Sequence, residues 1–167
     1  MKQPEKKVLE VKNLSISFHS TAGEVQAVRD VSFSLKKGEV LAIVGESGCG
    51  KSVLCKSIMK LLPGSAQIKS GKILLNGTDI TDYKEKEMQK IRGSAFSMIF
   101  QDPMIALNPV YTIGWQICEM IRSHERVTKK EARARALQLL KDMGIPNPEK
   151  RIDQYPHEFS GACASGP

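Results

Sequence analysis

The stretch that decides the fold is "GESGCGKS", Gly45 to Ser52, which fits the phosphate-binding pattern Gly-x-x-x-x-Gly-Lys-Ser/Thr in full. Each residue type in the pattern has a physical role. The glycines let the backbone curl so that its N–H groups face phosphate oxygens, Lys51 reaches the β- and γ-phosphates, and the Ser52 hydroxyl ligates Mg²⁺. The pattern therefore predicts a site for a nucleoside triphosphate and Mg²⁺, with a glycine-rich turn that binds nothing as the alternative.

The residues on either side of this loop favour the phosphate-binding interpretation. Residues 40–44, "VLAIV", form an uninterrupted apolar run, which is typical of a strand covered on both faces. A helix is predicted from about Gly50 to Leu62, ended by Pro63 and Gly64. The positive N-terminal end of this helix would face the phosphates.

Alternating apolar residues predict further strands in the first hundred residues. The apolar members of two such segments are Leu14, Ile16 and Phe18, and Val31, Phe33 and Leu35. Residues 71–80, "GKILLNGTDI", are predicted to form a strand that ends in an Asn-Gly turn, and residues 97–100 another short buried strand.

The last third of the chain is predicted to be helical. Thr128 and Glu131 make a capping box, and an apolar stripe at helical spacing follows until Gly144, which predicts a helix over residues 129–143. A second helix is predicted over residues 112–123.

The charge of the chain raises a second class of function. The 167 residues carry a formal net charge of +7, and residues 122–151 contain nine Lys or Arg against four Asp or Glu. This basic patch leaves nucleic-acid binding open. It lacks the interleaved aromatic residues of a single-strand binder, so a solvated helical face is the favoured interpretation.

The remaining composition is that of an ordinary globular protein, with 41% hydrophobic residues. No apolar run approaches the roughly 18 residues that span a bilayer, and no secretory signal is found, so a cytoplasmic chain is expected. The four cysteines and three histidines show no metal-ligand spacing, so reduced thiols and structural or solvated histidines are expected.

Residues 98–117, "MIFQDPMIALNPVYTIGWQI", resemble the glutamine loop of ABC-type ATP-binding subunits, and "ALNPVYTIG" looks like the branch that powers uptake of oligopeptides, dipeptides or nickel. The resemblance covers about residues 8–161, including "AVRDVSFSLKKGEVLAIVGESGCGKS" and "YPHEFSG". It implies an α/β P-loop NTPase of the ABC type, with an N-terminal antiparallel β-subdomain, an incomplete parallel core sheet and an α-helical subdomain.

We expect residues 1–167 to form a single, incomplete nucleotide-binding domain. The β-subdomain and P-loop core would occupy about residues 8–100, and the glutamine loop and helical subdomain about residues 101–161. Residues 162–167 would be an aberrant tail.

The resemblance also implies roles for individual residues. Lys51 and Gln101 would be catalytic, and Ser52 and Gln101 would contact Mg²⁺. Phe18 looks like the aromatic residue that stacks on adenine, although its place in an alternating strand allows a plain core role. The residues implied to bind ATP are Phe18, Gly45, Glu46, Ser47, Gly48, Cys49, Gly50, Lys51, Ser52 and Val53.

The implied partners are transmembrane permease subunits and a second ATP-binding subunit, at the inner face of the cell membrane, with no nucleic acid. Asp102 and Pro103 would shape the loop after Gln101. Residues 108–124 would form part of the permease-facing surface, with an ordinary helical lid as the alternative. The family recognises its solute on the permease and an external receptor rather than on the ATP-binding subunit.

Some features of the family are not found in the sequence. The family's Ser-Gly-Gly signature continues into a helix, an apolar strand ending in Asp-Glu, an aspartate loop and a switch histidine. In the family, the Glu of the Asp-Glu pair is the presumed general base for the attacking water. A general base is typically worth about 10²–10⁴-fold in rate, so poor hydrolysis by this chain alone is expected. The missing strand should lie beside residues 40–44, which predicts an unpaired apolar edge and a marginal, aggregation-prone fragment.

After Gly161 the last residues, "ACASGP" at 162–167, do not continue the signature. Loss of one nucleotide from codons for Gly-Gly-Met-Arg-Gln-Arg-Ala would produce "GACASGP", residues 161–167, so a frameshift is the expected origin of this tail. Three functions remain open: a truncated importer ATPase subunit for peptides or a related solute, a nonfunctional remnant that at most binds nucleotide, and a P-loop protein acting on nucleic acid.

Overall fold

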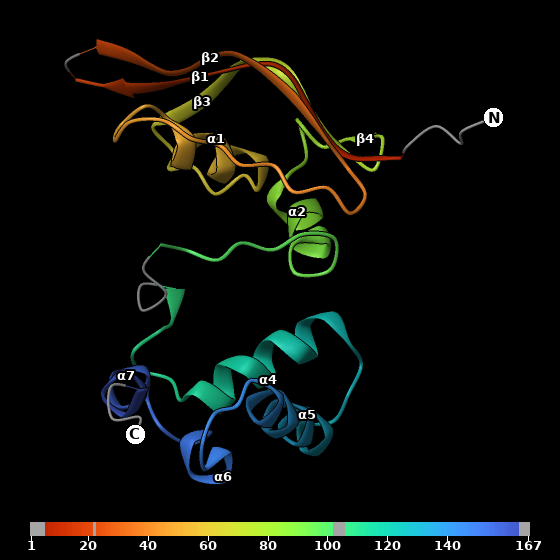
Figure 1. Cartoon of the computed structure of the whole chain (residues 1–167), viewed down its shortest axis with the longest axis vertical. Helices are drawn as coiled ribbons and strands as arrows, with labels where there is room; N and C mark the ends of the chain where they lie inside the picture. The colour runs from red at the N-terminus through yellow and green to blue at the C-terminus, as the bar shows by residue number, and fades with distance from the viewer. Residues whose placement is uncertain (1–5, 22, 102–105, 164–167) are drawn as a thin grey trace. The chain divides into compact units, whose positions relative to one another are not determined.

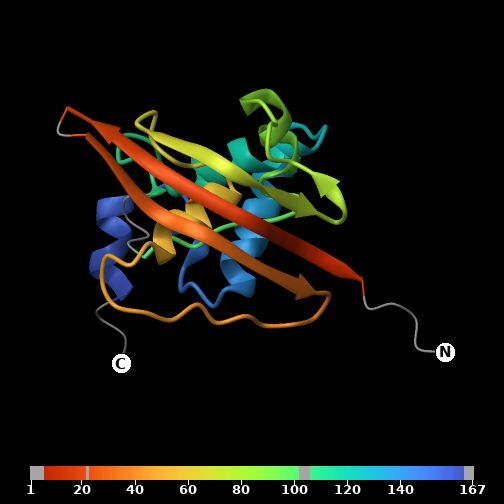
Figure 2. The same cartoon turned by 90° about the horizontal axis from the view of Figure 1, so that it is seen from above.

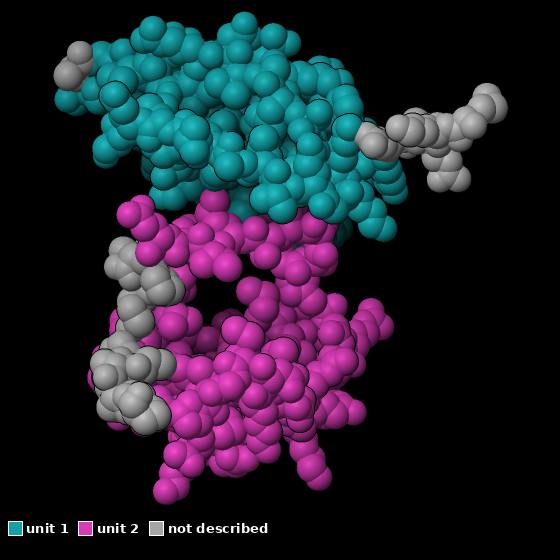
Figure 3. All heavy atoms as spheres, viewed as in Figure 1, with its two compact units in different colours: residues 1–92 teal, residues 93–167 magenta. Residues whose placement is uncertain are grey.

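The computed structural model describes residues 6–21, 23–101 and 106–163 of the chain (Figure 1). The chain divides into two compact units, residues 1–92 and residues 93–167 (Figure 3). The first unit holds the sheet and the phosphate-binding loop, and the second is helical. Among the described residues, none of the helices has the length and apolar character needed to cross a membrane.

The first unit is built on a four-stranded antiparallel sheet in the order β2-β1-β3-β4. Its strands are β1 (Lys7–Ser20), β2 (Gly23–Lys36), β3 (Ala66–Leu75) and β4 (Thr78–Asp79). Figure 2 shows β1 between its two long neighbours. The predicted strands in these segments are confirmed, and Leu14 and Ile16 are fully buried as their alternation requires.

Two helices complete the first unit, α1 (Lys51–Ile58) and α2 (Glu85–Ile91). Helix α1 follows the phosphate-binding loop and is shorter than predicted. The reason is a C-terminal turn in which Lys60 takes a left-handed φ of 52° and the Leu61 amide donates to the Lys56 carbonyl oxygen at 2.9 Å. The helix therefore stops before Pro63 rather than because of it.

Three residues with left-handed backbone lie next to one another on the three long strands: Asn13 (φ 48°), Asp30 (φ 47°) and Gly71 (φ 99°). The strand registers shift at these positions, so each strand carries a bulge there. A β-carbon at Gly71 would lie 2.6 Å from the Asn13 carbonyl oxygen, so a side chain does not fit. The Asn13 side-chain amide donates to the Asp30 carboxylate at 2.8 Å and bridges two of the bulges.

These bulges explain a burial that alternation alone does not predict. Ser15 would belong to the exposed face of β1, yet it is 9% exposed. Its hydroxyl oxygen accepts a hydrogen bond of 3.0 Å from the Asp30 amide, a backbone group that the bulge takes out of the regular ladder. The serine hydroxyl thus satisfies a donor that the sheet leaves unpaired.

Residues 40–44 and 97–100 do not form strands, so these two predictions are wrong. Both segments are exposed: the exposed fraction is 93% for Val40, 87% for Val44 and 95% for Ile99. A strand forms only where its backbone pairs with a neighbour, and no described segment pairs with either one. In the described part of the chain, the antiparallel sheet of the predicted fold is therefore formed and its parallel core sheet is not.

The second unit contains α4 (Ile113–His124), α5 (Lys129–Asp142), α6 (Pro148–Arg151) and α7 (Pro156–Cys163). Both helices predicted here, α4 and α5, are confirmed. The predicted capping box is also present, because Thr128 accepts from the Glu131 amide at 3.3 Å and the Glu131 carboxylate accepts from the Thr128 amide at 2.8 Å. The core of this unit is formed by Ile113, Ala136, Leu140 and Ile152.

Helix α7 begins within the "YPHEFSG" segment, residues 155–161, and continues past it to Cys163. Two residues of the predicted tail, residues 162 and 163, therefore continue a helix. Residues 164–167, the rest of that tail, lie outside the described residues.

Candidate functional site

The phosphate-binding loop is seated on β2 by a close approach of two backbones. Gly50, which precedes α1, has a φ of 95°, and a β-carbon there would lie 2.5 Å from the Ala27 carbonyl oxygen. Any other residue at this position would both strain the backbone and collide with β2. The second glycine of the motif is therefore required by a contact as well as by the turn.

Lys51 folds back across the loop that precedes it. Its side-chain ammonium donates to the carbonyl oxygens of Gly45 at 2.7 Å and Glu46 at 2.6 Å, and its nitrogen lies 3.5 Å from the Cys49 sulfur. These contacts hold the positive charge at the loop, where the sequence motif predicts phosphate oxygens.

The start of α1 is open to an anion. Gly50 provides no capping side chain, and the first turn contains no acidic residue. The first helical hydrogen bond runs from the Leu54 amide to the Gly50 carbonyl oxygen at 2.9 Å, so the amides of residues 51–53 have no partner within the helix. Such an N-terminus carries a partial positive charge and suits phosphate.

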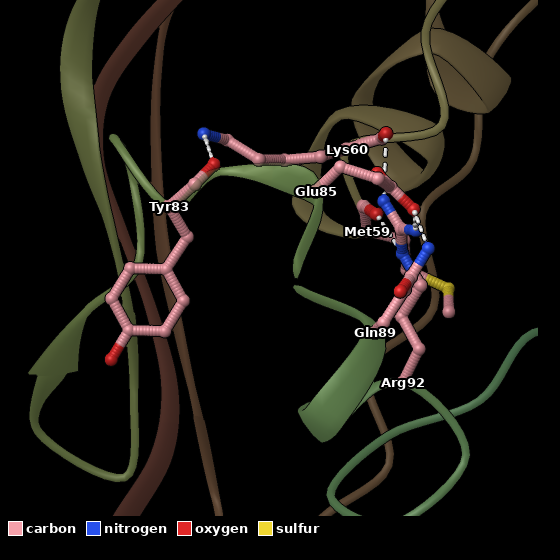
Figure 4. Close-up of polar contacts among 6 residues, drawn as sticks. All are labelled: Met59, Lys60, Tyr83, Glu85, Gln89 and Arg92. Carbon is pink, nitrogen blue, oxygen red and sulfur yellow. Dashed lines mark hydrogen bonds and ion pairs between the residues drawn. The ribbon is translucent and has the colours of Figure 1, made fainter. Parts of the chain in front are cut away.

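The other end of α1 is held by Arg92, which follows α2 (Figure 4). Its guanidinium donates to the carbonyl oxygens of Met59 at 2.9 Å and Lys60 at 3.0 Å, and to the Glu85 carboxylate at 2.6 Å. Lys60 reaches the opposite way and donates to the Tyr83 carbonyl oxygen at 2.7 Å. A cation at the C-terminal end of a helix stabilises it, so these contacts anchor the helix that carries the loop.

A cavity of about 620 Å³ lies between the loop and β2. It is lined by residues 25–29 and Val31 of β2, by Ile43 and Val44, and by residues 48–51 and Leu54. Along this described lining the charged side chains are Arg29 and Lys51, and there is no carboxylate. The donor set, with two cations and an open helix N-terminus, fits a polyphosphate.

The predicted ATP-binding residues fall into two groups. Gly48, Cys49, Gly50 and Lys51 line the cavity. The others are not among its lining residues, and they are Phe18, Gly45, Glu46, Ser47, Ser52 and Val53. Ser52 is exposed in the first turn of α1, where its hydroxyl remains accessible to a cation.

Phe18 is half-buried and pairs with Val25 on β2 and Ala66 on β3. Val25 rather than Phe18 lines the cavity, and it is 62% exposed. The stacking role of Phe18 therefore stays a prediction.

Gln101 is exposed and belongs to the second unit. Its role as a ligand of Mg²⁺ and of the attacking water stays a prediction. Asp102 and Pro103, which were expected to shape the loop after it, lie outside the described residues.

Sequence patterns alone did not identify the wall that β2 contributes to the cavity. Residues 25–29 approach the loop through tertiary structure, and no spacing in the sequence relates them to residues 48–51. The one indirect signal is Gly50, because a glycine in a motif often marks a close backbone approach.

The second unit presents aromatic residues at the start of α4. The rings of Tyr111 and Trp115 stack with centroids 4.0 Å apart, and their exposed fractions are 41% and 46%. A cavity of about 570 Å³ beside them is lined by Trp115, Cys118, Arg122 and Arg133, among others. Burial raises the pKa of the Cys118 thiol, which favours its protonated form.

Comparison with known proteins identifies several relatives. The oligopeptide transport ATP-binding protein OppD of Bacillus subtilis is 55% identical over 156 residues, which are 93% of this chain and 44% of that protein. The dipeptide transport ATP-binding protein DppD of Lactococcus lactis is 52% identical over 158 residues, 94% of this chain and 45% of that protein. The chain thus spans a little under half the length of these relatives.

Solved structures share the fold. A dimeric structure of the ATP-binding cassette MJ0796 in a post-hydrolysis state, bound to ADP and Pi, superposes with a TM-score of 0.75 at 24% identity. The match covers 92% of this chain and 63% of that one. The predicted α/β fold of the ABC type is confirmed by this likeness.

The sequence model of the family described as "ABC transporter" matches residues 28–164, which include the loop, the cavity wall from Val28 onward and the helical unit. Together with relatives more than 50% identical over nearly the whole chain, this match shows that the chain belongs to the ABC transporter family.

Proposed function

We propose that this chain binds MgATP at residues 45–53 and is part of the ATP-binding subunit of an ABC importer for peptides or a related solute. One observation carries the nucleotide assignment: the cavity of about 620 Å³ beside the loop is lined by the cations Arg29 and Lys51, with no carboxylate along its described lining. The names of the relatives, transport proteins for oligopeptides and dipeptides, support the solute class.

In this proposal the open amides of the first turn of α1 and the Lys51 ammonium bind the phosphates. Ser52 supplies a hydroxyl ligand to Mg²⁺, which is the chemistry that its place in the motif predicts. Bound Mg²⁺ would neutralise phosphate charge. Gln101 would contact the ion and orient water, and Phe18 would stack on the adenine.

We also propose two kinds of protein partner. The exposed stack of Tyr111 and Trp115, together with Met120 at 58% exposure, supports residues 108–124 as a surface for a membrane permease subunit. The dimeric solved structures support a second ATP-binding subunit as a partner. In this proposal ATP would lie between the two subunits. Such a complex would hold this chain at the inner face of the cell membrane.

Hydrolysis of ATP by these 167 residues alone is proposed to be slow. The sequence contains no adjacent Asp-Glu pair, which supplies the presumed general base in the family that it resembles. Positioned general bases are typically worth about 10²–10⁴-fold in rate.

The test is titration of the purified chain with MgATP by calorimetry, beside Lys51→Ala and the control Lys130→Ala. Lys130 is an exposed residue at the start of α5 in the other unit. We expect binding by the unmodified chain, a loss of about 10- to 100-fold for Lys51→Ala, and no loss for the control. Absence of saturable binding, or equal affinity in all three proteins, would reject the nucleotide assignment.

A further inference from the structure

Arg29 lies in β2 and lines the same cavity as the phosphate-binding loop. The phosphate-binding motif of residues 45–52 does not include it. We propose that Arg29 is a further nucleotide-binding residue, a second cation for the polyphosphate in addition to Lys51. This inference rests on the proposed nucleotide-binding function.

The first argument is the absence of a carboxylate partner. Among the described residues Asp30, the acid next to Arg29 in the sequence, forms no ion pair with it, and the Asp30 carboxylate accepts instead from the Asn13 side-chain amide at 2.8 Å. Within the described residues, the Arg29 side chain has no hydrogen-bond or ion-pair partner. The donors of its guanidinium are therefore not used by another described residue.

Other arginines of the chain contrast with this arrangement. Arg92 is paired with Glu85 at 2.6 Å, and Arg133 is paired with Asp153 at 2.7 Å. Each of those two guanidinium groups has a structural role within its unit. Arg29 has none among the described residues, and it is the arginine that lines the loop cavity.

The second argument is position along β2. Ala27 is the point at which the strand meets Gly50 of the loop. Arg29 is two residues further on, about 7 Å along an extended strand, a distance that a long arginine side chain can cross.

The third argument is chemical complementarity. The Lys51 ammonium already donates to the Gly45 and Glu46 carbonyl oxygens, so part of its hydrogen-bonding capacity is used by the loop. A planar guanidinium offers up to five donors and matches phosphate in a bidentate manner. Arg29 would therefore add contacts to phosphate oxygens that Lys51 cannot supply alone.

The experiment measures the affinity of the full chain for MgATP and for inorganic tripolyphosphate by calorimetry. The variants are Arg29→Ala, Arg29→Lys and the control Arg126→Ala, an exposed arginine of the other unit. We expect Arg29→Ala to weaken both ligands by a similar factor of about ten, Arg29→Lys to retain part of the affinity, and the control to match the unmodified chain. Thermal unfolding of each variant verifies that it is folded.

Two results would overturn the inference about Arg29 and leave the proposed function intact. One is unchanged affinity in Arg29→Ala while Lys51→Ala loses binding. The other is a loss for MgATP with none for tripolyphosphate, which would assign Arg29 to the nucleoside rather than to the phosphates. If the unmodified chain binds neither ligand, the proposed function and this inference fail together.

Discussion

Gly50 of the loop and Ala27 of β2 approach so closely that a β-carbon on Gly50 would lie 2.5 Å from the Ala27 carbonyl oxygen. The contact joins the phosphate-binding loop to the antiparallel sheet. The position of the loop therefore depends on the path of β2, and the path of β2 depends on its bulges.

A pair of glycine variants tests whether the approach of Gly50 to β2 determines the position of the loop. Gly48 and Gly50 both have positive φ values, 80° and 95°, but only a β-carbon at Gly50 meets another atom within 4 Å. Gly48→Ala should therefore show backbone strain alone, about 1–2 kcal/mol in the free energy of unfolding. Gly50→Ala should lose clearly more stability and more affinity for MgATP, as measured by denaturant unfolding and calorimetry. Equal losses in the two variants would show that the loop is not seated on β2.

Removal of the Arg92 side chain should destabilise the first unit. Arg92→Ala leaves the Met59 and Lys60 carbonyl oxygens without their donor at the end of α1, and the arginine side chain is only 18% exposed. We expect a loss of about 1–3 kcal/mol in the free energy of unfolding, measured by urea denaturation. Arg126→Ala, at an exposed position, serves as the control. An Arg92→Ala variant as stable as this control would contradict the anchoring role.

The Asn13 to Asp30 hydrogen bond across the two bulges is suited to a double-mutant cycle. Asn13→Ala should cost about 1–2 kcal/mol, because alanine loses the bridge and also disfavours the left-handed φ of 48°. Asn13→Gly loses the bridge and keeps the conformation, so it should cost less. Combined with Asp30→Gly, the cycle should give a coupling energy above about 0.5 kcal/mol. Strict additivity of the single losses would mean that the bridge contributes nothing.

Acid should weaken the second unit through Asp153. The hydrogen bonds from Arg133, at 2.9 and 2.7 Å, hold the pKa of the Asp153 carboxyl below its ordinary value of 3.8. Because the folded pKa is the lower one, the pair contributes its stability above pH 3.8, and this contribution is lost as the pH falls from there through the folded value. The effect should be small, since both side chains are about half exposed.

The measurement is the midpoint of thermal unfolding against pH for the chain and for Asp153→Asn. The difference between the two proteins should narrow in acid, and it should also narrow in high salt at neutral pH. A difference that is constant across the pH range would rule out a contribution from the ion pair.

Features that depend on local sequence could be predicted. The capping box at Thr128 and Glu131, the helices α4 and α5 and the alternating strands β1 and β2 are each set by residues within a few positions of one another. The phosphate-binding loop could also be predicted, since its glycines, Lys51 and Ser52 all lie within residues 45–52.

Features that depend on a distant partner could not be predicted. Residues 40–44 carry the composition of a buried strand, but composition does not supply the neighbour that a strand requires. The end of α1 differs from its prediction because the turn at Lys60 and the Arg92 contacts determine it, rather than the proline that follows. The cavity wall of residues 25–29 was missed for the same reason: β2 meets the loop only in three dimensions.

The backbone polar groups at the two ends of helix α1 are satisfied to different degrees. The turn at Lys60 and the Arg92 guanidinium occupy carbonyl oxygens at its C-terminal pole, whereas the amides of its first turn have neither a capping side chain nor a nearby acid on the helix. The eight-residue helix therefore presents the partial positive charge of its N-terminus, without a capping side chain, at the loop. The preference for anions over cations at this pole is built into the backbone before any ligand arrives.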